Sequence, residues 1–169
     1  MIEGNPIVLR AVEPGDVDFL YHLENDRDLW AVSNTRNPYS KRTLEQYAAE
    51  HHDIFADKQF RWVISANEKP VGCLDLFEFD PFHSRAGVGI AIDRPYRRNG
   101  FAETAIQLIM QRAKSDLGCR LLYANIASDN PTSAALFEKL GFQHIATLPH
   151  WHRTEMGKFI DQFLYCAFL

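Results

Sequence analysis

The segment that most clearly carries chemistry is "RPYRRNGFAETAIQLI", residues 94–109, which follows an apolar stretch and opens a helical pattern. A helix N-terminus presents unpaired backbone N–H groups and the positive end of the helix dipole, so it binds anions. Gly100 lets the backbone approach a ligand closely and Ala102 keeps the first turn narrow, while Arg97 and Arg98 add positive charge. The spacing R-x-x-G-x-A differs from the dinucleotide and Walker patterns. We predict a diphosphate-binding site here; the alternative is a solvated basic helix start.

The surrounding elements must hold this segment in place. Alternating or continuous apolar runs predict strands at 7–12, 60–65, 71–80, 85–93, 120–127, 142–151 and 158–169. Short turns join the second, third and fourth of these segments, which are expected to be antiparallel. Apolar residues three and four apart predict helices at 17–24, from Ser40 to about residue 54, at 100–117 and after Asn130, which precedes Pro131 as an N-cap. We therefore predict an α/β (α+β) fold, a mixed and mostly antiparallel sheet with helices on both faces.

Length and composition limit the classes of protein that the chain can be. A chain of 169 residues with 46% hydrophobic and 24% charged residues fits one globular domain, which we place at 1–169. The net charge of -4 argues against nonspecific nucleic-acid binding. The N-terminal residues resemble no signal peptide, and no apolar run is long enough to cross a membrane. The three cysteines are widely spaced, which favours reduced thiols and a cytoplasmic location over a disulfide framework.

Two motifs in register resemble one superfamily. "IAIDRPYRRNGFAETAIQLIMQRA" is similar to the acetyl-CoA site of the GCN5-related N-acetyltransferases, with its pattern [QR]-x-x-G-x-[GA] after a strand. "NPTSAALFEKLGF" resembles the second signature of that superfamily, at the expected distance downstream. "IVLRAVEPGDVDFLYHL" and "GKFIDQFLYCAFL" resemble its opening and closing segments, so the resemblance covers nearly the whole chain. Fold alone does not settle the substrate.

The resemblance implies which residues contact acetyl-CoA as cosubstrate. The strand before the first motif splays from its neighbour, and its backbone pairs with the pantetheine arm; here that strand carries Ile90, Ala91 and Ile92, with Gly87 or Gly89 expected to mark the bulge that opens the sheet. The pyrophosphate is expected on the N–H groups of Arg97, Arg98, Asn99, Gly100, Phe101 and Ala102. The second motif adds Asn130, Ser133, Phe137 and Lys139, and Asn130 is equally well explained as an N-cap.

The same resemblance directs attention to the carboxylates of one strand. In relatives the strand that here holds Asp75 and Glu78 faces the acceptor amine, which must lose a proton to attack the thioester. Residues three apart point to opposite faces of a strand unless a bulge intervenes. Glu78 has apolar neighbours, so desolvation is expected to raise its pKa, and we favour it over Asp75 as the base. The alternative for each is a carboxylate on a solvent face.

The leaving thiolate lacks an obvious proton donor. Many relatives carry a Tyr in the second motif, whereas this chain has Phe137, which cannot donate a proton. Tyr123, Tyr165 and Cys119 are the nearby candidates, and the role could also fall to water. Phe137 therefore keeps open a different class of function, a non-catalytic acyl-CoA-binding protein.

The acceptor amine is less well defined. The layout is similar to both the spermidine and the ribosomal-protein alanine N-acetyltransferases, so a small amine or polyamine is expected first and a peptide or protein N-terminus second. Arg36 and Asn37 stand where polyamine enzymes carry acids, although Asp75, Glu78 and Asp80 offer an acidic strip. Aromatic residues are candidates for lining the acceptor pocket: Trp30, Tyr39 and Trp151. The segment 150–152, His-Trp-His, is expected in a loop and not as a metal site, and self-association stays open.

Overall fold

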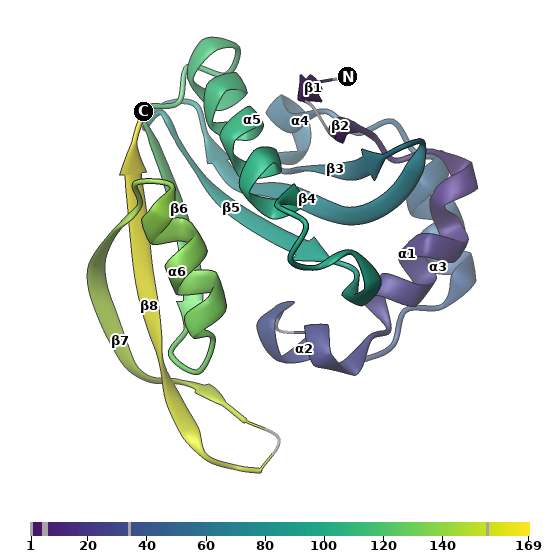
Figure 1. Ribbon diagram of the computed structural model, residues 1–169. Coiled ribbons are helices and arrows are strands. Elements are labelled where there is room, and N and C mark those ends of the chain that lie inside the picture. Colours follow the sequence, from purple (N-terminus) through teal and green to yellow (C-terminus); the bar gives the residue numbers. More distant parts are fainter. Residues whose placement is uncertain (1, 5–6, 34, 155) are drawn as a thin grey trace.

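The computed structural model describes residues 2–4, 7–33, 35–154 and 156–169, and the side chains of 7–30, 35–154 and 156–169. Its described strands form one sheet in the order β1-β2-β3-β4-β5-β6-β8-β7 (Figure 1). The strands are β1 (Ile2–Gly4), β2 (Ile7–Ala11), β3 (Phe60–Ala66), β4 (Lys69–Asp80), β5 (Arg85–Ile92), β6 (Leu121–Ala127), β7 (Gln143–Arg153) and β8 (Phe159–Phe168). Neighbouring strands are antiparallel except β5 and β6, which are parallel. The predicted mixed, mostly antiparallel sheet is confirmed.

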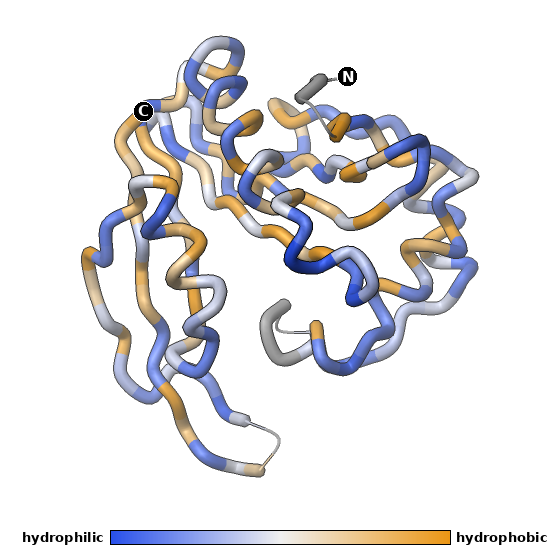
Figure 2. The backbone as a smooth tube through the Cα atoms, viewed as in Figure 1, coloured by the Kyte–Doolittle hydropathy of each residue, from blue (hydrophilic) through white to orange (hydrophobic). Residues whose placement is uncertain are grey.

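The helices cover both faces of this sheet, as predicted. They are α1 (Val17–Glu24), α2 (Arg27–Ser33), α3 (Lys41–Ala49), α4 (Ile54–Asp57), α5 (Phe101–Ser115) and α6 (Pro131–Lys139). The larger buried cluster joins α5 and α6 to the sheet, with Ile106 and Ile109 against Leu74 and Leu76. A smaller cluster on the opposite face joins α1 and α3 to Cys73. In Figure 2 these apolar stretches lie along the strands and the inner sides of the helices, whereas the connection between β5 and α5 is hydrophilic.

Local sequence signals explain where most of the elements begin and end. Ser40 caps α3, because its Oγ accepts a hydrogen bond from the Thr43 N–H at 3.1 Å. Asn67 and Glu68 both have positive φ, the geometry of a tight hairpin turn between β3 and β4. Gly118 after α5 and Gly141 after α6 also have positive φ, as expected of residues that follow a helix end.

The elements differ from the predictions in four places, one of which is β1, a strand that was not predicted. The predicted helix from Ser40 to about residue 54 is two helices, because α3 ends at Ala49 and α4 begins at Ile54. No helix was predicted at 27–33, where the structure has α2; the indole of Trp30 in this helix donates a hydrogen bond to the Glu24 carbonyl at 2.7 Å. The segment 150–152 lies in β7 and not in a loop, although the register with β8 shifts there and His150 has a φ of 53°.

None of the helices in the described part of the chain is both long enough and apolar enough to cross a membrane.

Candidate active site

The centre of the sheet opens between β5 and β6. The two strands pair only at Arg85↔Leu121, Ala86↔Leu122 and Gly87↔Tyr123 in the described register. Beyond Gly87 the strands diverge, and Figure 1 shows β1–β5 and β6–β8 as the two arms of a V. This is the splay that the sequence resemblance implied.

Phe77 marks the point at which the strands part. A Cβ on Gly87 would lie 2.5 Å from Cζ and 2.7 Å from Cδ2 of Phe77, so only glycine leaves room for that ring. The Phe77 ring also meets Tyr123 of β6 edge-on, with ring centroids 5.8 Å apart. The ring therefore fills the angle between β5 and β6.

The expectation that Gly87 or Gly89 marks a bulge in β5 is wrong. The register irregularity lies in the neighbouring strand, between Phe77 and Asp80 of β4, where Glu78 has a φ of 49°. Gly87 instead provides space for Phe77, and a Cβ on Gly89 would meet that ring at an ordinary 3.7 Å.

A cavity of about 480 Å³ passes through this opening. Its walls come from both arms of the sheet and from both faces. Of the residues predicted from the sequence it is lined by Ile90, Ala91, Asn130, Ser133, Phe137, Asp75, Tyr39 and Trp151. The sequence thus identified residues from five separate segments that meet around one space.

The N-terminus of α5 has the geometry of an anion cradle. Arg98 and Gly100 both have positive φ, at 64° and 79°, and no side chain caps the helix. The first intrahelical bond is from Thr104 N to the Gly100 carbonyl, and the described contacts give the N–H groups of residues 98–103 no acceptor. Several N–H groups and the helix dipole are thus free for a negatively charged ligand.

The side chains of the same turn hold its shape. Arg97 Nε donates to the Ile92 carbonyl at 2.9 Å, and Asn99 Nδ2 donates to the carbonyls of Tyr96 and Arg97 at 3.1 and 3.3 Å. These bonds tie the turn to the end of β5, while Arg98 is exposed and its described contacts include no ion pair. The side chains of Arg97 and Asn99 therefore stabilise the backbone conformation of the turn.

The second motif is built around a capped helix. Asn130 Oδ1 accepts a hydrogen bond from the Ser133 N–H at 3.1 Å, which confirms its N-cap role. Ser133 and Phe137 are one turn apart on α6, and both line the cavity. Lys139 lies outside the cavity lining and instead binds Glu103 of α5, with Nζ and Oε2 2.6 Å apart. Lys139 thus links the two helices that flank the opening.

The residues considered as proton donors to the thiolate in place of Phe137 all lie away from the cavity. Phe137 is 2% exposed and packs edge-on against Phe142, with ring centroids 4.9 Å apart. The Tyr165 hydroxyl donates to Glu138 at 2.9 Å, and the Tyr123 hydroxyl donates to Glu78. Burial and these carboxylates raise the pKa of both tyrosines. Tyr123, Tyr165 and the buried Cys119 all lie outside the cavity lining.

Glu78 does not have the apolar surroundings expected from the sequence. The irregularity in β4 turns its side chain into an exposed position, where it accepts the Tyr123 hydrogen bond, and it does not line the cavity. Simple alternation along β4 would place Phe79 on the face opposite Leu74 and Leu76, but Phe79 is buried in the same cluster as those residues. A strand that skips one residue reverses its alternation, so the simple period-two prediction fails after Phe77.

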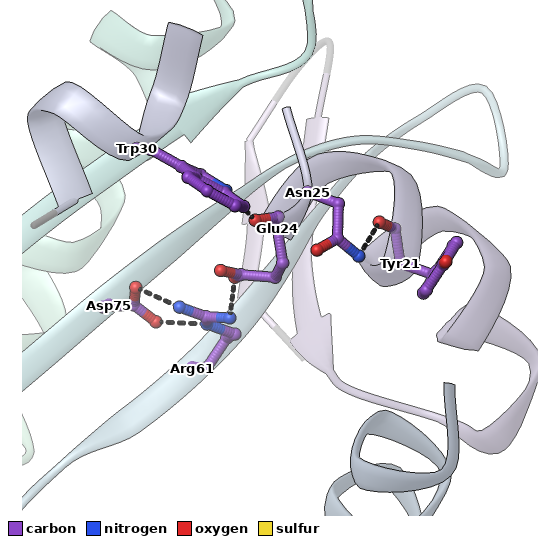
Figure 3. A network of polar contacts seen from close by, with 6 residues as sticks. All are labelled: Tyr21, Glu24, Asn25, Trp30, Arg61 and Asp75. Carbon is purple, nitrogen blue, oxygen red and sulfur yellow. Dashed lines mark hydrogen bonds and ion pairs between the residues drawn. The ribbon is translucent and has the colours of Figure 1, made fainter. Parts of the chain in front are cut away.

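Asp75 lines the cavity as part of a network that the sequence did not indicate. Arg61 of β3 donates to Asp75 through Nε at 2.7 Å and Nη2 at 2.9 Å (Figure 3). Its Nη1 donates to Oε1 of Glu24, at the end of α1. Trp30 of α2 in turn binds the Glu24 carbonyl. The network brings α1, α2, β3 and β4 together at the side of the cavity remote from α6.

The network is mostly buried and carries a net negative charge. The side chains of Glu24, Arg61 and Asp75 are 13%, 25% and 32% exposed. Burial opposes the charge on Arg61, but Asp75 and then Glu24 outweigh it, so the pKa of Arg61 lies well above its usual value. Two carboxylates thus share one permanently charged guanidinium, and one negative charge faces the cavity.

Comparison with known proteins agrees with this geometry. The acetyltransferase (GNAT) domain model matches residues 7–143. The chain is 29% identical over 139 residues to spermidine N(1)-acetyltransferase of Vibrio cholerae, covering 82% of this chain and 80% of that protein. The crystal structure of the Vibrio cholerae spermidine N-acetyltransferase with CoA and spermine superposes with a TM-score of 0.88 at 25% identity, covering 98% and 96% of the chains. A dodecameric structure of that enzyme gives a TM-score of 0.81 at 26% identity, with 98% and 95% covered.

The family match covers most of the chain and includes both the anion cradle and the opening between β5 and β6. The chain belongs to the GNAT acetyltransferase family and is an acetyl-CoA-dependent N-acetyltransferase.

Proposed function

We propose that the chain acetylates a primary amine of a small aliphatic amine or polyamine. The observation that carries this proposal is the position of the Glu24–Arg61–Asp75 network, which faces the cavity from the side opposite α6 with one uncompensated negative charge. A cationic amine is favoured there over a neutral or anionic acceptor. The similarity to an enzyme that was crystallised with CoA and spermine supports the same acceptor class.

The two substrates approach the opening from different sides. The N–H groups at the start of α5 hold the diphosphate of acetyl-CoA, with the residues of the turn from Arg97 to Ala102 around it. The free edge of β5 beyond Gly87, which includes Ile90, Ala91 and Ile92, offers backbone partners to the pantetheine arm. The acceptor enters from the side of the network and attacks the thioester carbonyl. A C–N bond forms, the C–S bond breaks and CoA leaves as a thiolate.

Glu24 is the carboxylate best placed to take the proton from the amine. Arg61 occupies both oxygens of Asp75 but only Oε1 of Glu24, and the described contacts leave Oε2 of Glu24 without a partner. We assign Asp75 the role of positioning Arg61 and Glu24. Glu24 therefore takes the place of Glu78 as the proposed base. Since Phe137 cannot donate a proton, water protonates the thiolate.

Two carboxylate variants test this assignment. Glu24→Gln is expected to lower kcat by about 10²- to 10⁴-fold, the usual contribution of a general base. Glu78→Gln, the matched change at an exposed carboxylate outside the cavity, is expected to leave kcat close to that of the parent. Equal losses in both variants would reject Glu24 as the base.

A panel of acceptors tests the proposed substrate class. CoA release is measured with spermidine, diamines, monoamines and peptides that begin with Ala or Ser. We expect the highest kcat/KM with an aliphatic amine. A preference for the peptides would identify a protein N-terminal acetyltransferase instead.

We also propose that the chain self-associates through the edge of its sheet. β7 is the last strand of the described order, and exposed apolar side chains gather on it and its neighbour: Ile145, Trp151, Phe159 and Phe168. An unpaired edge strand with exposed apolar groups favours pairing with another copy. Sedimentation velocity should give a mass above that of one chain, and a monomer at micromolar concentration would contradict this proposal.

A further inference from the structure

A second cavity lies beside the first on the face of the sheet covered by α1 and α3. Its volume is about 350 Å³, within the usual range for sites that hold small ligands. It shares five lining residues with the first cavity: Glu24, Tyr39, Arg61, Asp75 and Phe77. The Arg61 network and Phe77 therefore form a common wall, and the proposed function assigns no role to the space behind it.

The chemistry of the second cavity favours an aliphatic cation. Glu24 and Asp75 provide two carboxylates against the single guanidinium of Arg61. The rest of the lining is largely apolar and aromatic, including Tyr47, Phe60 and Phe77. Aromatic faces attract ammonium groups and also pack against methylene chains.

His52 does not reverse this charge balance. Its Nε2 lies 2.8 Å from the Tyr47 carbonyl, and its Nδ1 lies 3.7 Å from Oδ2 of Asp57. The carbonyl can only accept, so Nε2 carries a proton, and any second proton on the ring is balanced by Asp57. The wall shared by the two cavities thus keeps its one uncompensated negative charge.

We propose that the second cavity is the subsite for the non-reacting end of the acceptor, an aliphatic chain that carries a second ammonium group. The reacting amine lies at Glu24 in the first cavity, and the chain passes the common wall so that the second ammonium lies among Tyr47, Phe60 and the carboxylates. This inference rests on the proposed function and deepens it, because it assigns specificity for diamine-like acceptors to the residues that line the second cavity.

Gln59 offers a way to change the charge of this subsite alone. It is exposed, lines the second cavity and not the first, and lies between α4 and β3. Gln59→Lys adds a positive charge at the cavity, Gln59→Glu adds a negative charge of similar size, and Gln59→Leu is the neutral control. All three substitutions are at a surface position outside the catalytic network, so each is expected to fold.

The measurement is the ratio of kcat/KM for an α,ω-diaminoalkane to that for the n-alkylamine of equal length, at low ionic strength to limit screening. In the parent this ratio should exceed the factor expected from the diamine's second reactive amine. Gln59→Lys should lower the ratio by about five-fold and Gln59→Glu should raise it, since nearby charges act in opposite directions. Gln59→Leu should leave it unchanged, and kcat/KM for the monoamine should stay constant throughout.

The outcomes separate the two proposals. A ratio that is the same in Gln59→Lys and Gln59→Glu, or a parent ratio no larger than the statistical factor, would overturn the second subsite while monoamine turnover still supported the proposed function. Absence of CoA release with every amine would instead overturn the proposed function itself.

Discussion

Replacing Gly87 by Ala tests how the opening between β5 and β6 is formed. The new Cβ would lie 2.5 Å from Cζ and 2.7 Å from Cδ2 of Phe77, whereas ordinary contacts are 3.4–4 Å. Tyr123 packs edge-on against the same ring with centroids 5.8 Å apart, which limits how far the ring can move. The substitution therefore forces Phe77 toward the cavities that it lines.

The structure gives the size of the effect. Overpacking of this kind costs about 1–3 kcal/mol. Ala in a strand regains about 0.5–1 kcal/mol over Gly, because the unfolded chain has less freedom to lose. The expected net loss is about 0.5–2 kcal/mol in the free energy of unfolding. With a urea m-value of about 2 kcal/mol/M, the midpoint falls by about 0.25–1 M.

The assay is urea unfolding followed by tryptophan fluorescence, since Trp62 is buried in the core. Gly89→Ala is the matched control, because its Cβ would lie 3.7 Å from the same Phe77 ring. The control should be as stable as the parent or slightly more so. If Gly87→Ala is as stable as Gly89→Ala, the assignment of Phe77 as the residue that fills the angle between the strands is refuted.

Two further predictions concern the network and the thiols. Arg61→Met should lower the free energy of unfolding by about 2–4 kcal/mol, because it leaves two partly buried carboxylates without their cation. Urea unfolding checks this, with Arg85→Met, at an exposed ion pair, costing at most about 1 kcal/mol. A thiol reagent at about pH 8 should modify native protein slowly, because burial raises the pKa of Cys73 to about 12 and also raises the pKa of Cys119 and Cys166. All three thiols should react at once in denaturant, and rapid modification of the native protein would show that they are accessible.

The elements that depend on local signals could be predicted from the sequence. The junction at Gly100 combines a positive φ with a change from strand to helix periodicity. Asn130 and Pro131 indicate the capped start of α6. Because both motifs are short and continuous in the chain, most of the residues that they place around the cavity could be foreseen, and their contacts with acetyl-CoA stay predictions. Tyr39 and Trp151 were also foreseen, as aromatic residues of the acceptor side.

The acceptor side depends on contacts between distant segments, and there the sequence was insufficient. Glu24 and Arg61 are 37 residues apart, and no periodicity relates them. Glu78 was misplaced because a single irregularity in β4 reverses the faces of every residue that follows it. A bulge leaves little trace in one sequence, so Asp75 could be placed correctly and Glu78 could not.

The most direct test of the central claim is amine-dependent release of CoA from acetyl-CoA, with the acetylated amine identified by mass spectrometry. If the network side of the opening delivers an amine to the thioester, release of CoA and formation of the acetylated amine occur in equal amounts and require the amine. Tight binding of acetyl-CoA by calorimetry, with no acetylated product from any amine or peptide, would contradict this account and identify the chain as an acyl-CoA-binding protein.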